Sequence, residues 1–251
     1  MLDFEALRRL VEGQQYAPLF VTVSGAHLYG FPSADSDIDL RGSHLLPLRD
    51  VVGLSLPEET IDRELDLLGT EVELVSHELG KYLRLLVKNN GYILEQVLSP
   101  LVVTGAPFLA ELQPLARRCI TRHHYHHYRG FLATQRDFLA KQEPKVLKTL
   151  LYAYRVVLTG IHLLRTGEVE AYLPRLAEEY HLPFIADLIA QKRQEKGPAL
   201  DLDWPFHDNQ INELESRLDR AFEDSTVPED RDRRAINQFL VERRLASADT
   251  N

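Results

Sequence analysis

Along the first hundred residues, the pattern of hydrophobic and polar positions alternates between segments typical of strands and segments typical of helices. The segment Leu19–Val23 is apolar and β-branched, which is typical of a buried strand. Ile38 and Leu40 alternate with acidic residues, and a second alternating segment runs over Thr70–Val75. A period of two predicts strands that have one apolar face. Amphipathic helices are predicted between and after them at Glu78–Val87 and Ile93–Leu98.

The pattern becomes helical after Thr104-Gly105-Ala106-Pro107, because apolar positions then recur every three or four residues. The helices predicted from this spacing span Leu109–Ile120, Tyr125–Lys141, Pro144–Leu164, Leu173–Tyr180, Pro183–Glu195, Asn209–Ser225 and Glu229–Leu245. A looser stretch at 197–205 precedes the last two, and the tail after Ala246 is expected to fray. We therefore predict an α/β (α+β) domain with a mixed sheet at residues 1–105, followed by an all-α helical domain at residues 106–251.

Length, charge and cysteine content narrow the class of protein. A chain of 251 residues suits one large or two small domains. The net charge of -9 does not favour a large nucleic-acid footprint, so a nucleotide is the safer ligand. The single Cys119 cannot form an internal disulfide, which agrees with a reducing, cytoplasmic compartment. No basic and apolar leader is seen, and no apolar run approaches the roughly 20 residues of a membrane span, so no membrane partner is expected.

The candidate chemistry lies between residues 24 and 39. Ser24 and Gly25 follow the first strand and open a short helix, where backbone N–H groups can approach a phosphate. Asp37 and Asp39 lie on one face of the next strand, where they repel each other and lose solvation. A divalent cation accounts for this cost, since Mg²⁺ favours carboxylate and phosphate oxygens.

These motifs resemble those of the DNA polymerase beta-like nucleotidyltransferase superfamily. Its signature is Gly-Ser, a spacer, Gly, Asp-x-Asp, and then a third carboxylate on a later strand; here the first pair is inverted to Ser24-Gly25. The form Ser36-Asp37-x-Asp39-Leu40-Arg41-Gly42 is closest to the branch of predicted nucleotidyltransferases named for an RNA repair pathway. The resemblance covers roughly residues 18–175, and its further matches are Glu71–Leu79, Lys81–Leu83, Asn89–Gly91 and Leu94–Gln96.

The resemblance implies a Mg²⁺- or Mn²⁺-dependent transfer of a nucleoside monophosphate from a nucleoside triphosphate to an acceptor hydroxyl, with release of pyrophosphate. Asp37, Asp39 and a third carboxylate would be the catalytic metal ligands. Glu73 is favoured as the third, and Glu71 on the same strand face remains open. The nucleotide-binding residues near the strands would be Ser24, Gly25, Ser36 and Lys81, although Lys81 also fits a solvated helical position. The acceptor implied is an RNA 3′ end, a small molecule or a partner protein.

A basic stripe on a later helix is the other candidate for nucleotide binding. Lys145, Lys148, Tyr152 and Arg155 are spaced by three, four and three residues, which places them on one helical face. A solvated stripe is one interpretation. The resemblance favours the other, in which Lys148, Tyr152 and Arg155 bind the phosphates and the base or sugar.

Two other features leave different functions open. The His123–His127 cluster has two histidines one helical turn apart, but packing is favoured over metal binding because no third ligand has a zinc-like spacing. The Arg118-x4-His123 spacing loosely matches helical ribonucleases. A non-catalytic nucleotide sensor or partner-binding module that retains the fold is a further alternative. The oligomeric state is not predicted.

Overall fold

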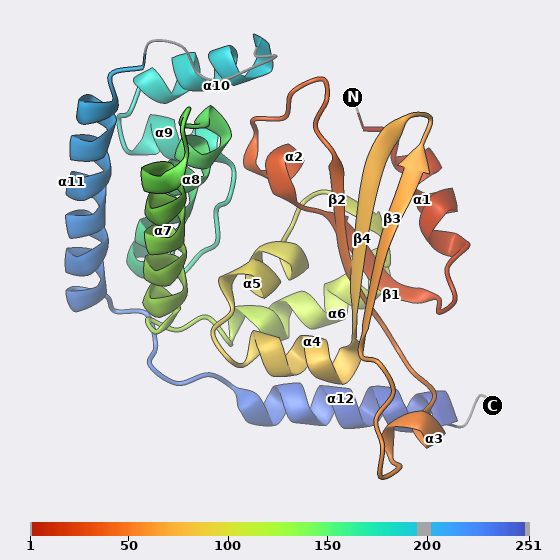
Figure 1. The fold of residues 1–251 in the computed structure, drawn as a ribbon. Coiled ribbons are helices and arrows are strands. Elements are labelled where there is room, and N and C mark those ends of the chain that lie inside the picture. The colour runs from red at the N-terminus through yellow and green to blue at the C-terminus, as the bar shows by residue number, and fades with distance from the viewer. Residues whose placement is uncertain (1, 195–201, 249–251) are drawn as a thin grey trace. The chain divides into compact units, whose positions relative to one another are not determined.

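The computed structural model describes residues 2–194 and 202–248, which form two compact units (Figure 1). The sheet unit comprises the described residues of Met1–Gly25, Ser36–Cys119 and Asp230–Asn251. The helical unit comprises those of Ala26–Asp35 and Ile120–Glu229. Each is described below by itself.

The sheet unit is built on a five-stranded mixed sheet with the order β3-β4-β2-β1-β5. β2 and β4 pair in parallel, whereas the other neighbouring pairs are antiparallel. The strands are β1 (Pro18–Val23), β2 (Ile38–His44), β3 (Thr60–Leu67), β4 (Thr70–Glu78) and β5 (Val102–Thr104). The predicted class, a mixed sheet followed by a helical region, is confirmed.

Helices cover both faces of this sheet. On one face, α1 (Phe4–Glu12) packs its Leu7 and Val11 against apolar residues of β1, β2, β4 and β5. On the other face, the Phe20 ring of β1 contacts Tyr82 of α4 (Leu79–Leu86) and Phe108 of α6 (Ala106–Arg117). The Thr22 hydroxyl donates to the carbonyl of Gln96 in α5 (Gly91–Val97), 3.1 Å away. The two faces of the buried strand β1 therefore pack into two cores.

The helical unit is organised around α8 (Leu147–Thr166), which contacts α7, α9, α10 and α11. Apolar side chains surround most of α8, as expected for a helix buried on several sides. The other helices of the chain are α2 (Gly25–Tyr29), α3 (Leu48–Val51), α7 (His124–Lys141), α9 (Leu173–Glu179), α10 (Phe184–Gln194), α11 (Trp204–Glu223) and α12 (Arg233–Ala248). None of the described helices is long and apolar enough to cross a membrane.

The boundaries differ from the expected ones in several places. The domain boundary at residue 105 stays a prediction, and by contacts α6 and α12 group with the sheet unit. α8 begins at Leu147 rather than Pro144, so Lys145 precedes the helix. Within the loose stretch at 197–205, residues 197–201 lie outside the described residues, and α11 already begins at Trp204. For the tail expected to fray after Ala246, α12 continues to Ala248, and the rest lies outside the description.

Candidate active site

The parallel pairing of β2 and β4 brings two predicted carboxylates together. Asp39 of β2 is directly in register with Glu73 of β4. Both point away from the face that α1 covers, because their neighbours Ile38, Leu40 and Leu74 belong to that apolar core. Glu71 lies on the same strand face but is exposed, whereas Glu73 and Asp37 are half-buried.

Arg41 joins the two carboxylates through a single atom. Its Nη2 lies 2.8 Å from Asp39 Oδ1 and 2.9 Å from Glu73 Oε2. Its Nη1 donates to two backbone carbonyl oxygens, those of Leu40 at 3.0 Å and Glu73 at 3.3 Å. These contacts fix the guanidinium on the strand surface and satisfy part of the negative charge of the pair.

The Asp39 carboxylate is partly buried beside other carboxylates. Burial raises the pKa of Asp39 above its ordinary value, Arg41 opposes this, and the carboxylates of Asp37 and Glu73 add to the rise. Like charges that close to one another favour protonation of one of them or binding of a cation. Arg41 therefore neutralises only part of the negative charge of these carboxylates, and further positive charge would stabilise them.

The turn after β1 packs directly against Asp39. Gly25 has a φ of +60°, and a Cβ there would lie 1.7 Å from Asp39 Oδ2, so only glycine fits at this point. The backbone N–H of Ser24 donates to the Asp39 carbonyl oxygen at 2.8 Å. This hydrogen bond commits the Ser24 N–H to the sheet.

The donor set fits a hard divalent cation that is shared with a ligand. Among the described residues, no group of three or more His, Cys, Asp or Glu side chains is arranged to hold a metal ion by itself. Mg²⁺, however, is commonly bound by one or two carboxylates together with substrate phosphates. Asp39 and Glu73, already drawn together on one cationic nitrogen, supply such a pair.

Comparison with known proteins identifies the family of the chain. The model of the RlaP family, described as the RNA repair pathway DNA polymerase beta family, matches residues 3–242. The chain belongs to this family. It is thus a DNA polymerase beta-family, nucleotidyltransferase-like protein, and the resemblance found in the sequence is confirmed.

Two relatives of this RlaP-family chain are described only as uncharacterized proteins. It is 35% identical over 158 residues to the uncharacterized protein MJ0002 of Methanocaldococcus jannaschii, a match that covers 61% of this chain and 63% of the relative. It is 26% identical over 208 residues to the uncharacterized protein YcgL of Bacillus subtilis (strain 168), with 79% and 78% covered. The match to MJ0002 thus spans less than two thirds of that protein.

A solved structure is also similar to the RlaP-family chain. It is the nucleotidyltransferase-like protein from Exiguobacterium sibiricum 255-15, with a TM-score of 0.34 and 14% identity. The match covers 88% of this chain and 74% of that one.

Lys81 lies at the far end of β4 from Glu73. Its Nζ donates to the Thr60 hydroxyl, and Thr60 pairs with His77, four residues or about 13 Å along the strand from Glu73. The structure therefore does not bring Lys81 beside the carboxylates. Ser36 is half-buried and lies just before β2. The nucleotide-binding roles of both residues stay predictions.

The side chains of the predicted stripe on α8 differ in how exposed they are. Lys148 is exposed, Tyr152 is half-buried and Arg155 is fully buried. The Arg155 guanidinium lies 3.9 Å from the centre of the Tyr29 ring, and the Tyr152 ring meets Tyr29 edge-on at 5.6 Å. These cation–π and aromatic contacts give Arg155 and Tyr152 a structural part within the helical unit. Their predicted contact with nucleotide stays a prediction.

The histidine cluster packs within the helical unit. His124 is buried, and its Nδ1 lies 3.0 Å from the Thr121 carbonyl oxygen. Burial lowers the pKa of His127 to about 4, with smaller contributions from His124 and Arg155. The rings of His123 and His126 stack on each other. Arg118 belongs to the sheet unit, where it pairs with Asp232, whereas His123 belongs to the helical unit.

Arg41 is the residue whose part in the site the sequence did not reveal. It stands inside the quoted motif, two residues after Asp39, and a period of two already places it on the carboxylate face. That periodicity was the available signal. The periodicity does not identify the neighbouring strand. Glu73 lies beside Arg41 only because β2 and β4 pair in this register.

Proposed function

We propose that this chain is a divalent-metal-dependent nucleotidyltransferase that moves a nucleoside monophosphate from a nucleoside triphosphate to an acceptor hydroxyl. The observation that carries the proposal is the convergence of Asp39 and Glu73 on one nitrogen of Arg41 beside the Gly25 turn. Family membership supports it independently, since proteins of the DNA polymerase beta type use carboxylates on neighbouring strands in this way.

Each residue has a defined part in this reaction. Asp37, Asp39 and Glu73 would hold the cation, and Ser24 and Gly25 would bind the triphosphate. A cation bound there would supply positive charge that stabilises the triphosphate and the leaving pyrophosphate. Glu73 takes the proton of the acceptor hydroxyl while the new phosphorus–oxygen bond forms and the bond to pyrophosphate breaks. Catalysis is then mainly a matter of positioning and of neutralising charge.

Arg41 has a second part that follows from its contacts. A divalent cation held by Asp39 and Glu73 would compete with the Arg41 guanidinium for these carboxylates. Arg41 then keeps the carboxylates in register in the absence of ligand and turns a donor toward the phosphates once they bind. The acceptor is an RNA end in our first hypothesis, in keeping with the name of the family.

The test is a transfer assay in which the acceptor is not chosen in advance. Native protein and the Asp37→Asn/Asp39→Asn variant are incubated with each α-³²P-labelled nucleoside triphosphate, Mg²⁺ or Mn²⁺, and pooled RNA, protein and metabolites. Label transferred by the native protein and absent with the variant is the expected result, and the labelled pool identifies the acceptor class. The matched control is Glu12→Gln/Glu58→Gln, which removes two exposed carboxylates of the same unit and should transfer label normally.

Two other outcomes would replace the proposal. Metal-dependent nucleotide binding without transfer, lost in the variant, would point to a nucleotide sensor. RNA shortened without any divalent cation would point to a ribonuclease of the helical region.

A further inference from the structure

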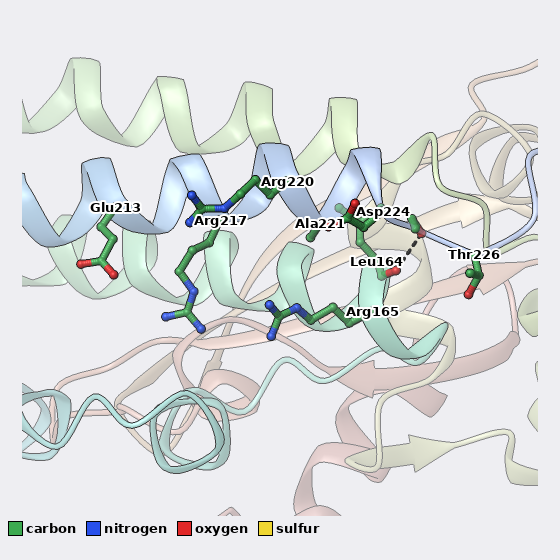
Figure 2. A pocket seen from close by; sticks show the side chains of 9 residues that line it. Leu164, Arg165, Glu213, Arg217, Arg220, Ala221, Asp224 and Thr226 are labelled. Atoms are coloured by element: carbon green, nitrogen blue, oxygen red, sulfur yellow. Dashed lines mark hydrogen bonds between the residues drawn. The ribbon is translucent and has the colours of Figure 1, made fainter.

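A cavity of about 480 Å³ lies between the end of α8, the last turns of α11 and the segment that follows α11 (Figure 2). Three arginines line it: Arg165 from α8, and Arg217 and Arg220 from α11. Figure 2 shows the guanidinium groups of Arg165 and Arg217 turned toward the same space from two different helices. We call this cavity the α8–α11 pocket.

The three arginines have no acidic partner within the part of the chain that the structure describes. No carboxylate there lies within 4.0 Å of their nitrogens, although Glu213 and Asp224 also line the cavity. Arginines elsewhere in the helical unit do pair, and they include Arg122 with Glu229, Arg129 and Arg136 with Glu215, and Arg175 with Glu170. The charged side chains that line the pocket are therefore three arginines and two carboxylates, a small positive excess in a chain whose net charge is -9.

Two faces of α11 make this contrast directly. Glu215 and Asp219 face α7, where they pair with Arg129. Arg217 and Arg220 lie three residues apart on another side of the helix, facing the cavity. The partial negative charge of a helix C-terminus favours Arg165 and Arg220, which lie in last turns, but Arg217 is nearly two turns from the end of α11.

Two of the guanidinium groups lie near the same buried ring. Arg217 lies 5.4 Å and Arg165 lies 5.9 Å from the centre of the Tyr180 ring, which is 6% exposed. A guanidinium that rests near an aromatic ring keeps its N–H donors available at its edge, in the fork geometry that matches phosphate oxygens. On the rim, the Ser225 hydroxyl donates to the Leu164 carbonyl oxygen at 2.7 Å, which ties the segment after α11 to α8.

We propose that the α8–α11 pocket binds the phosphate of a nucleotide, either free or within an RNA strand. The three arginines bind the phosphate oxygens. The carboxylates of Glu213 and Asp224 would repel a bare anion, so they favour a phosphate that carries hydroxyl or amino donors, as a nucleotide does through its sugar and base. The proposal does not depend on nucleotidyl transfer, because each residue that it uses belongs to the helical unit.

The experiment measures binding by fluorescence anisotropy in EDTA. The two probes are a labelled single-stranded RNA of eight nucleotides and a fluorescent nucleoside triphosphate. Arg165→Gln/Arg217→Gln is compared with Lys141→Gln/Arg175→Gln, which removes the same charge from exposed positions of the helical unit outside the pocket. Thermal unfolding of each variant shows whether it is folded.

The expected result is a loss of affinity of about tenfold or more in the pocket variant and of less than about threefold in the control. For RNA, the slope of log affinity against log salt should also fall by roughly 1.4, because two phosphate contacts are lost. Arg217→Lys, which keeps the charge but loses the fork, should lie between the native protein and the double variant.

The outcomes separate the two sources of phosphate. If the pocket variant loses affinity for RNA alone, the pocket binds an RNA strand. If it loses affinity for the triphosphate, the pocket binds a free nucleotide. Equal losses in the pocket and control variants would mean that charge alone is responsible, and the proposal would be overturned. It would be overturned equally by a folded pocket variant that binds both probes as the native protein does, or by a native protein that binds neither.

Discussion

Arg41 and the arginines of the α8–α11 pocket carry the same functional group in opposite settings. Arg41 donates to two carboxylates and two backbone carbonyl oxygens, so both of its terminal nitrogens are bonded within the protein. Arg165, Arg217 and Arg220 line a cavity and pair with none of the described carboxylates. The difference teaches that charge count alone does not locate function: one arginine organises acids for a cation, and the others leave donors available for an anion.

The largest expected effect distinguishes two glutamates of β4. Glu73→Gln removes the carboxylate that shares Arg41 with Asp39, and it should slow label transfer by about a hundredfold or more. Glu71→Gln changes an exposed residue of the same strand face and should slow transfer less than about threefold. Initial rates of transfer with saturating triphosphate measure both. Equal losses would mean that Arg41 does not mark the catalytic carboxylate.

Acid should weaken the strand that carries Asp39 and Arg41. His44 of β2 is 1% exposed, and burial, followed by the nearby His77, lowers its pKa to about 4 from 6.5. The unfolded chain therefore takes up a proton that the folded chain resists, so stability is lost as pH falls from about 6.5 toward 4. The loss from His44 should reach roughly 2 to 3 kcal/mol.

Hydrogen exchange of the β2 amides at several pH values measures this effect. His44→Gln should flatten the pH dependence, whereas His126→Gln, at an exposed position, should leave it unchanged. An unaltered pH profile in His44→Gln would show that His44 is not the group responsible.

Removing Arg41 tests whether it stands in for a cation. In Arg41→Ala, Asp39 and Glu73 keep their places but lose the shared donor, so the free energy of unfolding in EDTA should fall by about 1 to 2 kcal/mol. Mn²⁺ should then stabilise the variant more than it stabilises the native protein, since binding to the folded state alone adds stability. Urea unfolding with EDTA and with Mn²⁺ gives both numbers. Identical stabilisation by Mn²⁺ would contradict competition at these oxygens.

The smallest effects compare the two sides of α11. Arg129→Gln breaks the contacts with Glu215 and Asp219 and should cost about 1 kcal/mol of unfolding free energy, because these groups are partly exposed and screened. Arg217 faces the cavity, so Arg217→Gln should change the free energy of unfolding by less than about 0.5 kcal/mol. Thermal unfolding of the two single variants measures the difference. A cost for Arg217→Gln as large as that for Arg129→Gln would assign the pocket arginine a structural part.

The patterns that predicted the central strands are local ones. The apolar run before Ser24 and the alternation around Asp39 are complete within a few residues, and β1, β2 and β4 were expected on that basis. β3 was not, because its central residues Asp62, Arg63 and Glu64 are all exposed and give no alternation. It is a strand because β4 pairs with it along its length through a tight turn at Leu68 and Gly69.

The remaining features depend on contacts that are distant in the sequence. Lys145 fits the helical spacing of the basic stripe, but it lies before α8, with its Nζ 4.9 Å from the centre of the Trp204 ring. Arg165 and Arg217 meet around Tyr180 although 52 residues separate them, and no periodicity within either helix indicates that meeting. Charge pattern in a single helix predicts a face, whereas a pocket needs the packing of several helices.

The contact between Gly25 and Asp39 offers geneticists an unusually clean allele. A methyl group at position 25 would overlap Asp39 Oδ2, and the backbone of Gly25 has a φ of +60°. Gly25→Ala therefore disturbs the acidic centre without removing any charged group. The variant protein keeps every carboxylate and every arginine of the native sequence. Phenotypes shared with a carboxylate allele would then report lost chemistry, and phenotypes confined to a deletion would report lost assembly.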